Sequence, residues 1–246
     1  MLPGIYDIFQ ERWGKGQSVW IYSDPHFNDK DLTCGVRNRP SAEEQIKKIN
    51  SKCGRKDTFI CLGDVGDLEC VRKLRAAYKV LIMGNHDAGA TNYKRVIEHK
   101  SFDANRYSKE KVCEIMEKIY PGWKISVKAE ISFQFPFNLW VAYADNQLFD
   151  EIYEGPLIIG EKLILSHEPI NIPWAFNIHG HCHDPKHKND SHHLNVCCDA
   201  TGYELLNLNQ FLKQGHMSKI ETIHRSTINV ATERKRKRGG KKICDL

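Results

Sequence analysis

Five short apolar runs along the chain each lead into a polar residue that can bind a metal ion. The runs are SVWIYS (18–23), DTFICL (57–62), KVLIM (79–83), KLILS (162–166) and AFNI (175–178). The residues that follow them are Asp24 and His26, then Asp64, Asn85 and His167, and finally His181 and His183. In open α/β sheets, sites assemble in the loops beyond the carboxyl ends of the strands. The five endings therefore predict one shared site.

The segments between these runs favour an α/β fold. Residues 41–53 predict a helix, with Ser41 and Glu44 in capping-box spacing, and residues 68–75 predict a shorter one. The resulting β-α-β-α-β order predicts a largely parallel sheet flanked by helices. Further helices are expected at 91–99, 108–120 and 206–215, and further strands at 131–137, 139–143, 156–160 and 193–198.

Residues 99–153 hold eleven of the twenty-four aromatic residues. A surface on which nucleic-acid bases stack is one interpretation. The alternation of Ile131, Phe133, Phe135 and Phe137 favours the other interpretation, a second sheet packed on the first. Pro136 places an edge or a bend in that strand.

The donor types at the predicted site restrict its chemistry. Imidazole, carboxylate and amide groups together suit divalent Mn, Fe, Zn, Co or Ni, and we take Mn as the first choice. Seven donors exceed the need of one tetrahedral ion. A bridging carboxylate such as Asp64 could join two ions about 3.5–4 Å apart, which would stabilise an in-line displacement at phosphorus.

Each motif alone has an ordinary structural explanation. Asp24-Pro25-His26 could be a turn, Asp64 could cap the helix that follows it, and the sequence GNHD could be a turn at a strand exit. The segment HGHCHDPKH could be a solvated histidine-rich loop. It is the order and joint occurrence of the four motifs that favour a metal site.

Composition and charge set the remaining expectations. The chain has 246 residues, of which 41% are hydrophobic and 27% charged, as in ordinary globular proteins. No apolar run approaches the roughly 20 residues of a membrane span, and the first residues lack a signal-peptide pattern, so we expect a cytoplasmic protein. Nine cysteines without a CxxC pair favour reduced thiols over disulfides or a zinc ribbon.

The net charge of +5 resides in the last residues of the chain. Residues 232–246 hold seven Lys or Arg residues against Glu233 and Asp245, so the rest of the chain is neutral. We expect one domain over residues 1–230 and a disordered basic tail over residues 231–246. A solvated terminus is the favoured interpretation of the tail, with nucleic acid as a possible partner.

The motifs Asp24-x-His26, Gly63-Asp64-x-x-Asp67, Gly84-Asn85-His86-Asp87, Ser166-His167-Glu168-Pro169 and Gly180-His181-x-His183 occur in this order along the chain. In that order they resemble the calcineurin-like metallophosphoesterase superfamily. The resemblance implies a four-layer sandwich of two mixed sheets with helices outside, two divalent metal ions and a phosphate-ester substrate, possibly a nucleotide.

The resemblance also implies residue roles. One ion would be held by Asp24, His26, His183 and the bridging Asp64, and the other by Asp64, Asn85, His167 and His181. A hydroxide between the ions would attack phosphorus. His86 would protonate the leaving oxygen or hold a phosphate oxygen, and Asp67 would orient His86, unless Asp67 is only a residue at a helix N-terminus. His179 matches no motif position and is taken as structural.

Departures from the family narrow the prediction. Leu68-Glu69 and Asp87 stand where the protein-phosphatase branch has Arg-Gly and Glu, and no tyrosine ligand of the purple acid phosphatases is present. The chain thus resembles the compact bacterial or phage-type phosphoesterases, which hydrolyse mono- or diesters. A nuclease or end-processing enzyme is the alternative enzyme, and a metal-binding scaffold without catalysis is the alternative of another class.

Overall fold

The computed structural model describes residues 2–15, 17–30, 39–87, 93–131, 138–184, 186 and 189–239. The chain divides into two compact units, one of Met1–Ala88 with Glu151–Leu246 and one of Gly89–Asp150. Val112, Met116, Ala142 and Ala144 form a small core within the second unit. The single domain over residues 1–230 stays a prediction.

The first unit contains two mixed sheets. One has the order β12 (Leu206–Asn207), β1 (Val19–Tyr22), β2 (Thr58–Cys61), β3 (Tyr78–Ile82) and β7 (Glu151–Tyr153). Strands β1, β2, β3 and β7 run parallel, and β12 pairs with β1 in the antiparallel direction. This arrangement agrees with the largely parallel sheet that the sequence predicts.

The second sheet has the order β11 (His193–Asn195), β10 (Phe176–His179), β9 (Leu163–Ser166) and β8 (Leu157–Gly160). Strands β9, β10 and β11 are parallel, and β8 is antiparallel to β9. Ile21 and Ile60 from the first sheet share one buried core with Leu165 and Ile178 from the second. The two sheets therefore pack face to face.

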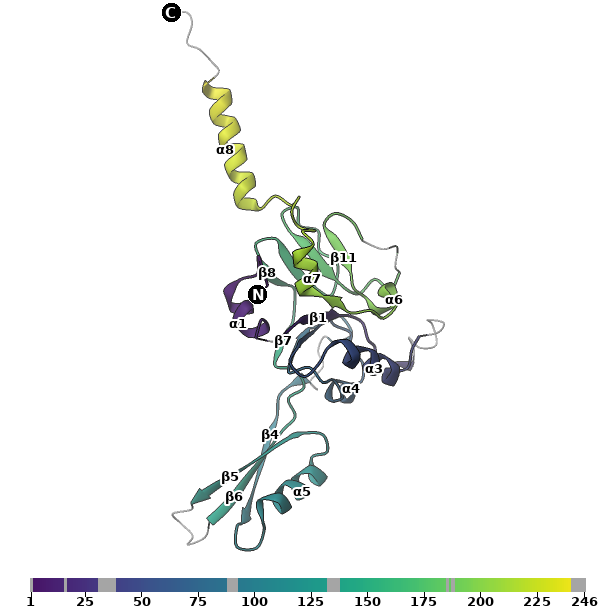
Figure 1. Ribbon diagram of the computed structural model, residues 1–246, viewed down its shortest axis with the longest axis vertical. Coiled ribbons are helices and arrows are strands. Elements are labelled where there is room, and N and C mark those ends of the chain that lie inside the picture. The colour runs from purple at the N-terminus through teal and green to yellow at the C-terminus, as the bar shows by residue number, and fades with distance from the viewer. Residues whose placement is uncertain are drawn as a thin grey trace, which may run out of the picture. The chain divides into compact units, whose positions relative to one another are not determined.

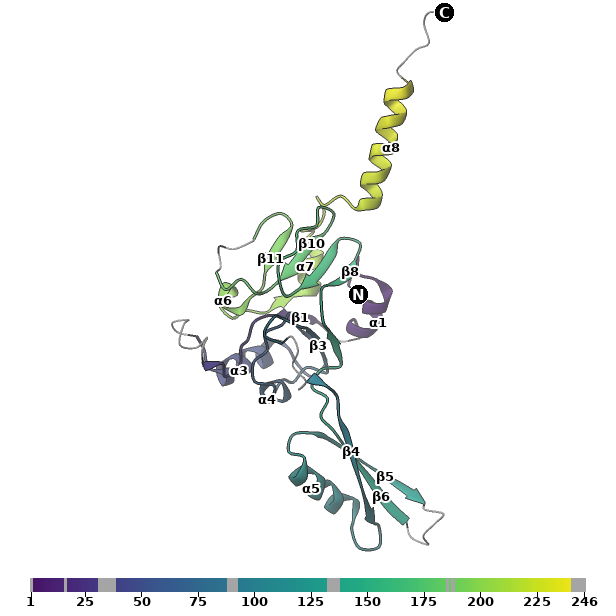
Figure 2. The ribbon, with the colours of Figure 1, turned by 180° about the vertical axis from the view of Figure 1, so that it is seen from behind.

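Helices flank these sheets. They are α1 (Asp7–Trp13), α3 (Ala42–Lys52), α4 (Glu69–Arg72), α6 (Cys198–Thr201) and α7 (Leu208–Lys213). In both views α3 and α4 lie on the side of the first sheet away from β8–β11 (Figures 1 and 2). Strand β2 is buried along its whole length, as a strand covered on both faces must be. The predicted α/β fold, with mixed sheets flanked by helices, is confirmed.

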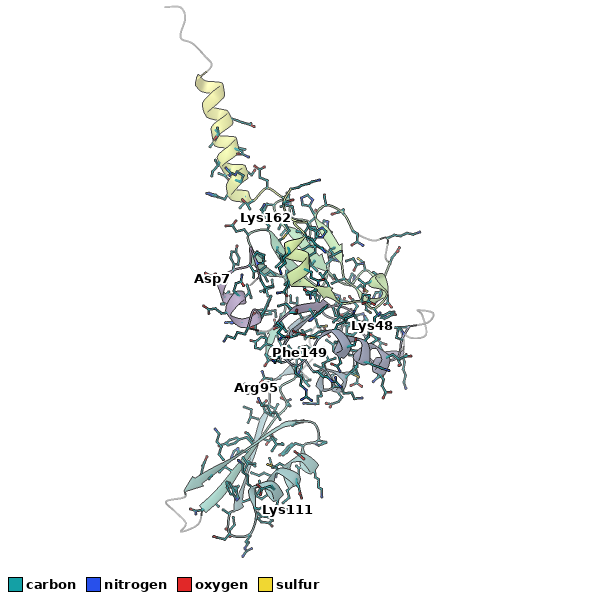
Figure 3. All side chains as sticks on the ribbon, in the orientation of Figure 1. Asp7, Lys48, Arg95, Lys111, Phe149 and Lys162 are labelled. Atoms are coloured by element: carbon teal, nitrogen blue, oxygen red, sulfur yellow. The ribbon has the colours of Figure 1, made fainter. Side chains whose placement is uncertain are left out.

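Helix α3 begins where the sequence predicts. The Ser41 hydroxyl accepts from the Glu44 backbone N–H at 3.3 Å, and the Glu44 carboxylate accepts from the Ser41 N–H at 2.8 Å. The capping box is thus complete. Lys48 on this helix (Figure 3) donates to the Gly202 carbonyl and pairs with Glu204, which joins α3 to the segment after α6.

Helix α8 (Ile223–Gly239) differs from the predicted disorder beyond residue 230. The residues of α8 up to Glu233 are exposed to solvent. The segment lacks proline and holds six Arg or Lys residues, which have high helix propensity. No helix in the described part of the chain is long and apolar enough to cross a membrane.

The second unit is a three-stranded antiparallel sheet with one helix. Its strands have the order β4 (Ile97–Asp103), β6 (Asn138–Asp145) and β5 (Lys124–Ile131), and the helix is α5 (Lys109–Ile119). Val112 and Met116 of α5 pack on Ala142 and Ala144 of β6. The predicted helix over 108–120 is therefore confirmed.

The helix expected over 91–99 is wrong for its last residues. Residues 97–99 belong to β4 and pair with β6, and residues 91–92 lie outside the described part of the chain. The described strands of the aromatic segment, β4, β5 and β6, pack against α5, whereas β8–β11 form the second sheet of the first unit. Phe133, Phe135, Pro136 and Phe137 lie outside the described residues.

Candidate metal centre

The seven predicted ligands follow the ends of β1, β2, β3, β9 and β10, and the structure brings their side chains together. Donor atoms of Asp24, His26 and His183 lie within 4.8 Å of one another, and so do those of Asp64, His167 and His181. We call these sets the first and the second donor group. Asn85 joins the second group, with its Oδ1 2.8 Å from Nε2 of His167 and 3.2 Å from Nδ1 of His181.

Asp64 lies between the two donor groups. Its Oδ2 is 3.5 Å from Nε2 of His26, in the first group, and 3.4 Å from Nε2 of His167, in the second. Its Oδ1 accepts from the His86 backbone N–H at 2.9 Å. One carboxylate oxygen of Asp64 thus faces imidazoles of both groups.

The backbone at the site adopts unusual conformations. Asp24, His26, Asp64 and His181 have φ angles of 57°, 40°, 52° and 64°. Residues other than glycine rarely occupy this left-handed region, which costs of order 1–3 kcal/mol each and clusters at functional sites. Four of the seven predicted ligands thus share this unusual backbone conformation.

Two motif glycines are required by close packing. A Cβ atom at Gly84 would lie against Oδ1 of Asp64 and only 2.8 Å from Cε1 of His167. A Cβ at Gly180 would collide with the side chains of Ser23 and Asp24. The glycines of the sequences GNHD and GHCH therefore leave room for the neighbouring donor side chains.

Burial at the site supports a metal-binding role. Asp24, His26, Asp64 and His167 are at most 4% exposed. The Nε2 atom of His26 is buried without a hydrogen-bond partner among the described residues. Since an unsatisfied buried polar atom is costly, and this nitrogen faces Asp64, the donor set fits a divalent ion.

Two histidines of the site, His167 and His183, have raised pKa values when no cation is present. Burial lowers the pKa of His167, but the hydrogen bond and charge of Asp64, with the charge of Asp24, raise it to about 9 overall. Hydrogen bonds with Asp199 and Cys197 raise the pKa of His183 to about 10. Because a histidine must be neutral to bind a metal, ions and protons compete for these two side chains.

Asp87 organises the loops that carry the donors, a role the sequence analysis did not assign. Its Oδ2 accepts from the backbone N–H groups of Asp64 at 2.7 Å and Gly84 at 2.9 Å, and its Oδ1 accepts from Val65 at 3.2 Å. The side chain is 2% exposed. In the sequence, its position in the GNHD motif is the feature that could have indicated this role.

His86 and Asp67, the two predicted catalytic residues, are not joined by a hydrogen bond in the described structure. The His86 ring is exposed and lies 5.3 Å from the His26 ring between centroids. Asp67 accepts from Nδ2 of Asn28 at 2.7 Å and from the Glu69 N–H at 3.0 Å. The orientation of His86 by Asp67 stays a prediction.

Asp199, Arg39 and His179 also lie near the site. No sequence motif marks Asp199 or Arg39 as part of the site. His179 is fully buried, with Nδ1 2.8 Å from the Gly180 carbonyl oxygen. This placement agrees with a structural role for His179.

Comparison with known proteins identifies the family. Residues 18–205 match the calcineurin-like phosphoesterases, and the chain belongs to this family. No match was found among curated proteins. A crystal structure of a protein of unknown function from Aquifex aeolicus is similar at 19% identity with a TM-score of 0.47, covering 80% of this chain and 98% of that one. The family supports metal-dependent phosphoester hydrolysis in general.

Proposed function

We propose that this protein is a hydrolase of phosphate mono- or diesters that uses two divalent ions, with Mn as the first choice. The observation that carries the proposal is the place of Asp64, whose Oδ2 faces imidazole nitrogens of both donor groups. The buried, unpartnered Nε2 of His26 supports it. The free thiols of the described cysteines are compatible with the cytoplasm as the proposed compartment.

In this proposal Asp24, His26 and His183 hold one ion, and Asn85, His167 and His181 hold the other, with Asp64 shared. Two such ions supply charge neutralisation at phosphate and lower the pKa of a water molecule. The Asp87 carboxylate holds the backbone at Asp64 and Gly84 in place by accepting hydrogen bonds from their N–H groups.

His86 is the proposed proton donor to the leaving oxygen. Its backbone is fixed by the N–H bond to Asp64, while its ring is exposed beside His26. An imidazole that carries a proton can donate it to a leaving oxygen within hydrogen-bond reach. The alternative role for His86 is a hydrogen bond from Nδ1 or Nε2 to a phosphate oxygen. Turnover of the His86→Ala chain on esters with progressively poorer leaving groups separates the two roles.

A metal-by-substrate screen tests the function. The metal-depleted chain is assayed with Mn, Ni, Co, Zn and Mg against p-nitrophenyl phosphate, its bis ester, cyclic nucleotides and short oligonucleotides. We expect metal-dependent hydrolysis of at least one ester, abolished in Asp64→Asn. A preference for oligonucleotides would favour the nuclease alternative. Metal binding without hydrolysis of any ester would favour the scaffold.

A further inference from the structure

One imidazole connects the metal centre to a buried carboxylate outside the proposed ligands. Nε2 of His183 lies 3.9 Å from Oδ1 of Asp24, within the first donor group. On the other side of the ring, Nδ1 lies 2.6 Å from Oδ2 of Asp199. His183 thus presents one nitrogen to the proposed ion and the other to Asp199.

Arg39 ties this carboxylate to the chain at Asp24. Its Nη1 forms an ion pair with Asp199, and its Nη2 donates to the carbonyl oxygens of Asp24 and Pro25 at 2.7 Å each. The Arg39 and Asp199 side chains are 1% and 6% exposed. The Tyr203 hydroxyl donates to the other oxygen of Asp199. We call Arg39 and Asp199 the brace.

The brace has a defined physical effect on His183. A carboxylate can only accept, so in the neutral ring the short contact with Asp199 places the proton on Nδ1 and leaves Nε2 to bind a cation. The planar guanidinium binds Asp199 and the Asp24–Pro25 backbone together, which a point charge such as lysine could not reproduce. Two ligands of the first donor group are thereby held by one buried ion pair.

The second donor group has a different support. Nδ1 of His167 lies 2.8 Å from the carbonyl oxygen of Leu62. That oxygen belongs to the neutral backbone, whereas His183 contacts the charged carboxylate of Asp199. The histidines of the two donor groups are therefore supported unequally.

We propose that Asp199, held by Arg39, is a positioning residue that sets the affinity of the first donor group for its divalent ion and affects the second group less. This inference rests on the proposed two-metal function. It predicts that changes to the brace weaken one ion selectively. Outer carboxylates of this kind typically contribute 10–100-fold to metal affinity.

The test measures Mn binding to the full chain by equilibrium dialysis with metal analysis. The variant is Asp199→Asn, and the matched control is Asp190→Asn, which alters another Asp–His pair, with Nδ1 of His193 2.9 Å from Asp190. We expect two ions in the unmodified chain and in the control. In Asp199→Asn one ion binds 10–100-fold more weakly and the other is weakened less.

Every outcome of the dialysis either supports or overturns the proposed role of the brace. Native affinity for both ions in Asp199→Asn overturns the brace while leaving the two-metal function intact. Equal weakening of both ions also overturns it. An unmodified chain that binds fewer than two ions defeats the proposed function itself, and the brace with it.

A second variant guards against misfolding. If thermal unfolding shows that metal-free Asp199→Asn is not folded, Arg39→Lys replaces it in the same dialysis. The lysine keeps the positive charge but cannot reach Asp199 and both carbonyl oxygens as a planar fork. Selective loss of one ion in Arg39→Lys supports the brace, and unchanged affinity for both ions overturns it.

Discussion

Asp87→Asn removes a charge that holds two ligand loops together. In the native chain the carboxylate accepts three backbone N–H groups, from Asp64, Val65 and Gly84. An asparagine side chain has one accepting oxygen and one amide nitrogen that can only donate. Whichever way it turns, its NH₂ group faces at least one backbone N–H, so at least one of these bonds is lost.

The size of the effect follows from these bonds. A hydrogen bond to a charged group contributes about 1.5–3 kcal/mol. For a chain of this size each kcal/mol lowers Tm by about 2–4 °C, so Asp87→Asn should lower Tm by about 3–12 °C. Because the lost bonds fix the backbone of Asp64, metal affinity should fall as well.

The assay is thermal unfolding of the metal-free and Mn-loaded chains, with Mn affinity measured in parallel. Asp57→Asn is the matched control, since Asp57 also accepts two backbone N–H groups, those of Ser18 and Gly54, away from the centre. It should lose comparable stability and keep its Mn affinity. An Asp87→Asn chain with native Tm and native Mn affinity would refute this reasoning.

Three further predictions concern catalysis, the C-terminus and pH. His86→Ala should keep metal content near normal and lower turnover about 10²–10⁴-fold; unchanged turnover on an ester with a poor leaving group would contradict it. Truncation after residue 231 should leave hydrolysis of a small ester unchanged, and a loss confined to oligonucleotides and erased by salt would instead indicate nucleic-acid binding. The pKa values of His167 and His183 are raised to about 9 and 10, so their protonation stabilises the metal-free fold. That contribution is complete below their unfolded pKa of about 6.5 and is lost as pH rises through 9–10, so Tm of the EDTA-treated chain should fall over this range, and a rising Tm there would contradict the assignment.

Local patterns predict most of the first unit. Apolar runs such as SVWIYS and DTFICL become β1 and β2 because burial on both faces requires such runs. Ser41 and Glu44 mark the start of α3 because the capping box depends on residues only three positions apart. The polar residues at the strand ends lie together because parallel strands end at the same edge.

Contacts between distant residues explain what the sequence did not reveal. Residues 97–99 pair with residues 143–145 in the second unit, and this pairing overrides the local helical pattern. Arg39 and Asp199 are 160 positions apart and lie in no recognisable motif. Helix α1, β7 and β12 are short elements whose position depends on pairing or packing with the rest of the core.

The most direct test of the account is electron paramagnetic resonance of the chain titrated with Mn. If Asp64 joins two ions, the second equivalent should produce the spectrum of an exchange-coupled pair, because bridged ions lie only about 3.5–4 Å apart. Asp64→Asn should abolish the coupling and most of the hydrolysis. Binding of one ion per chain at saturating Mn, or two ions without coupling, would contradict the two-metal centre.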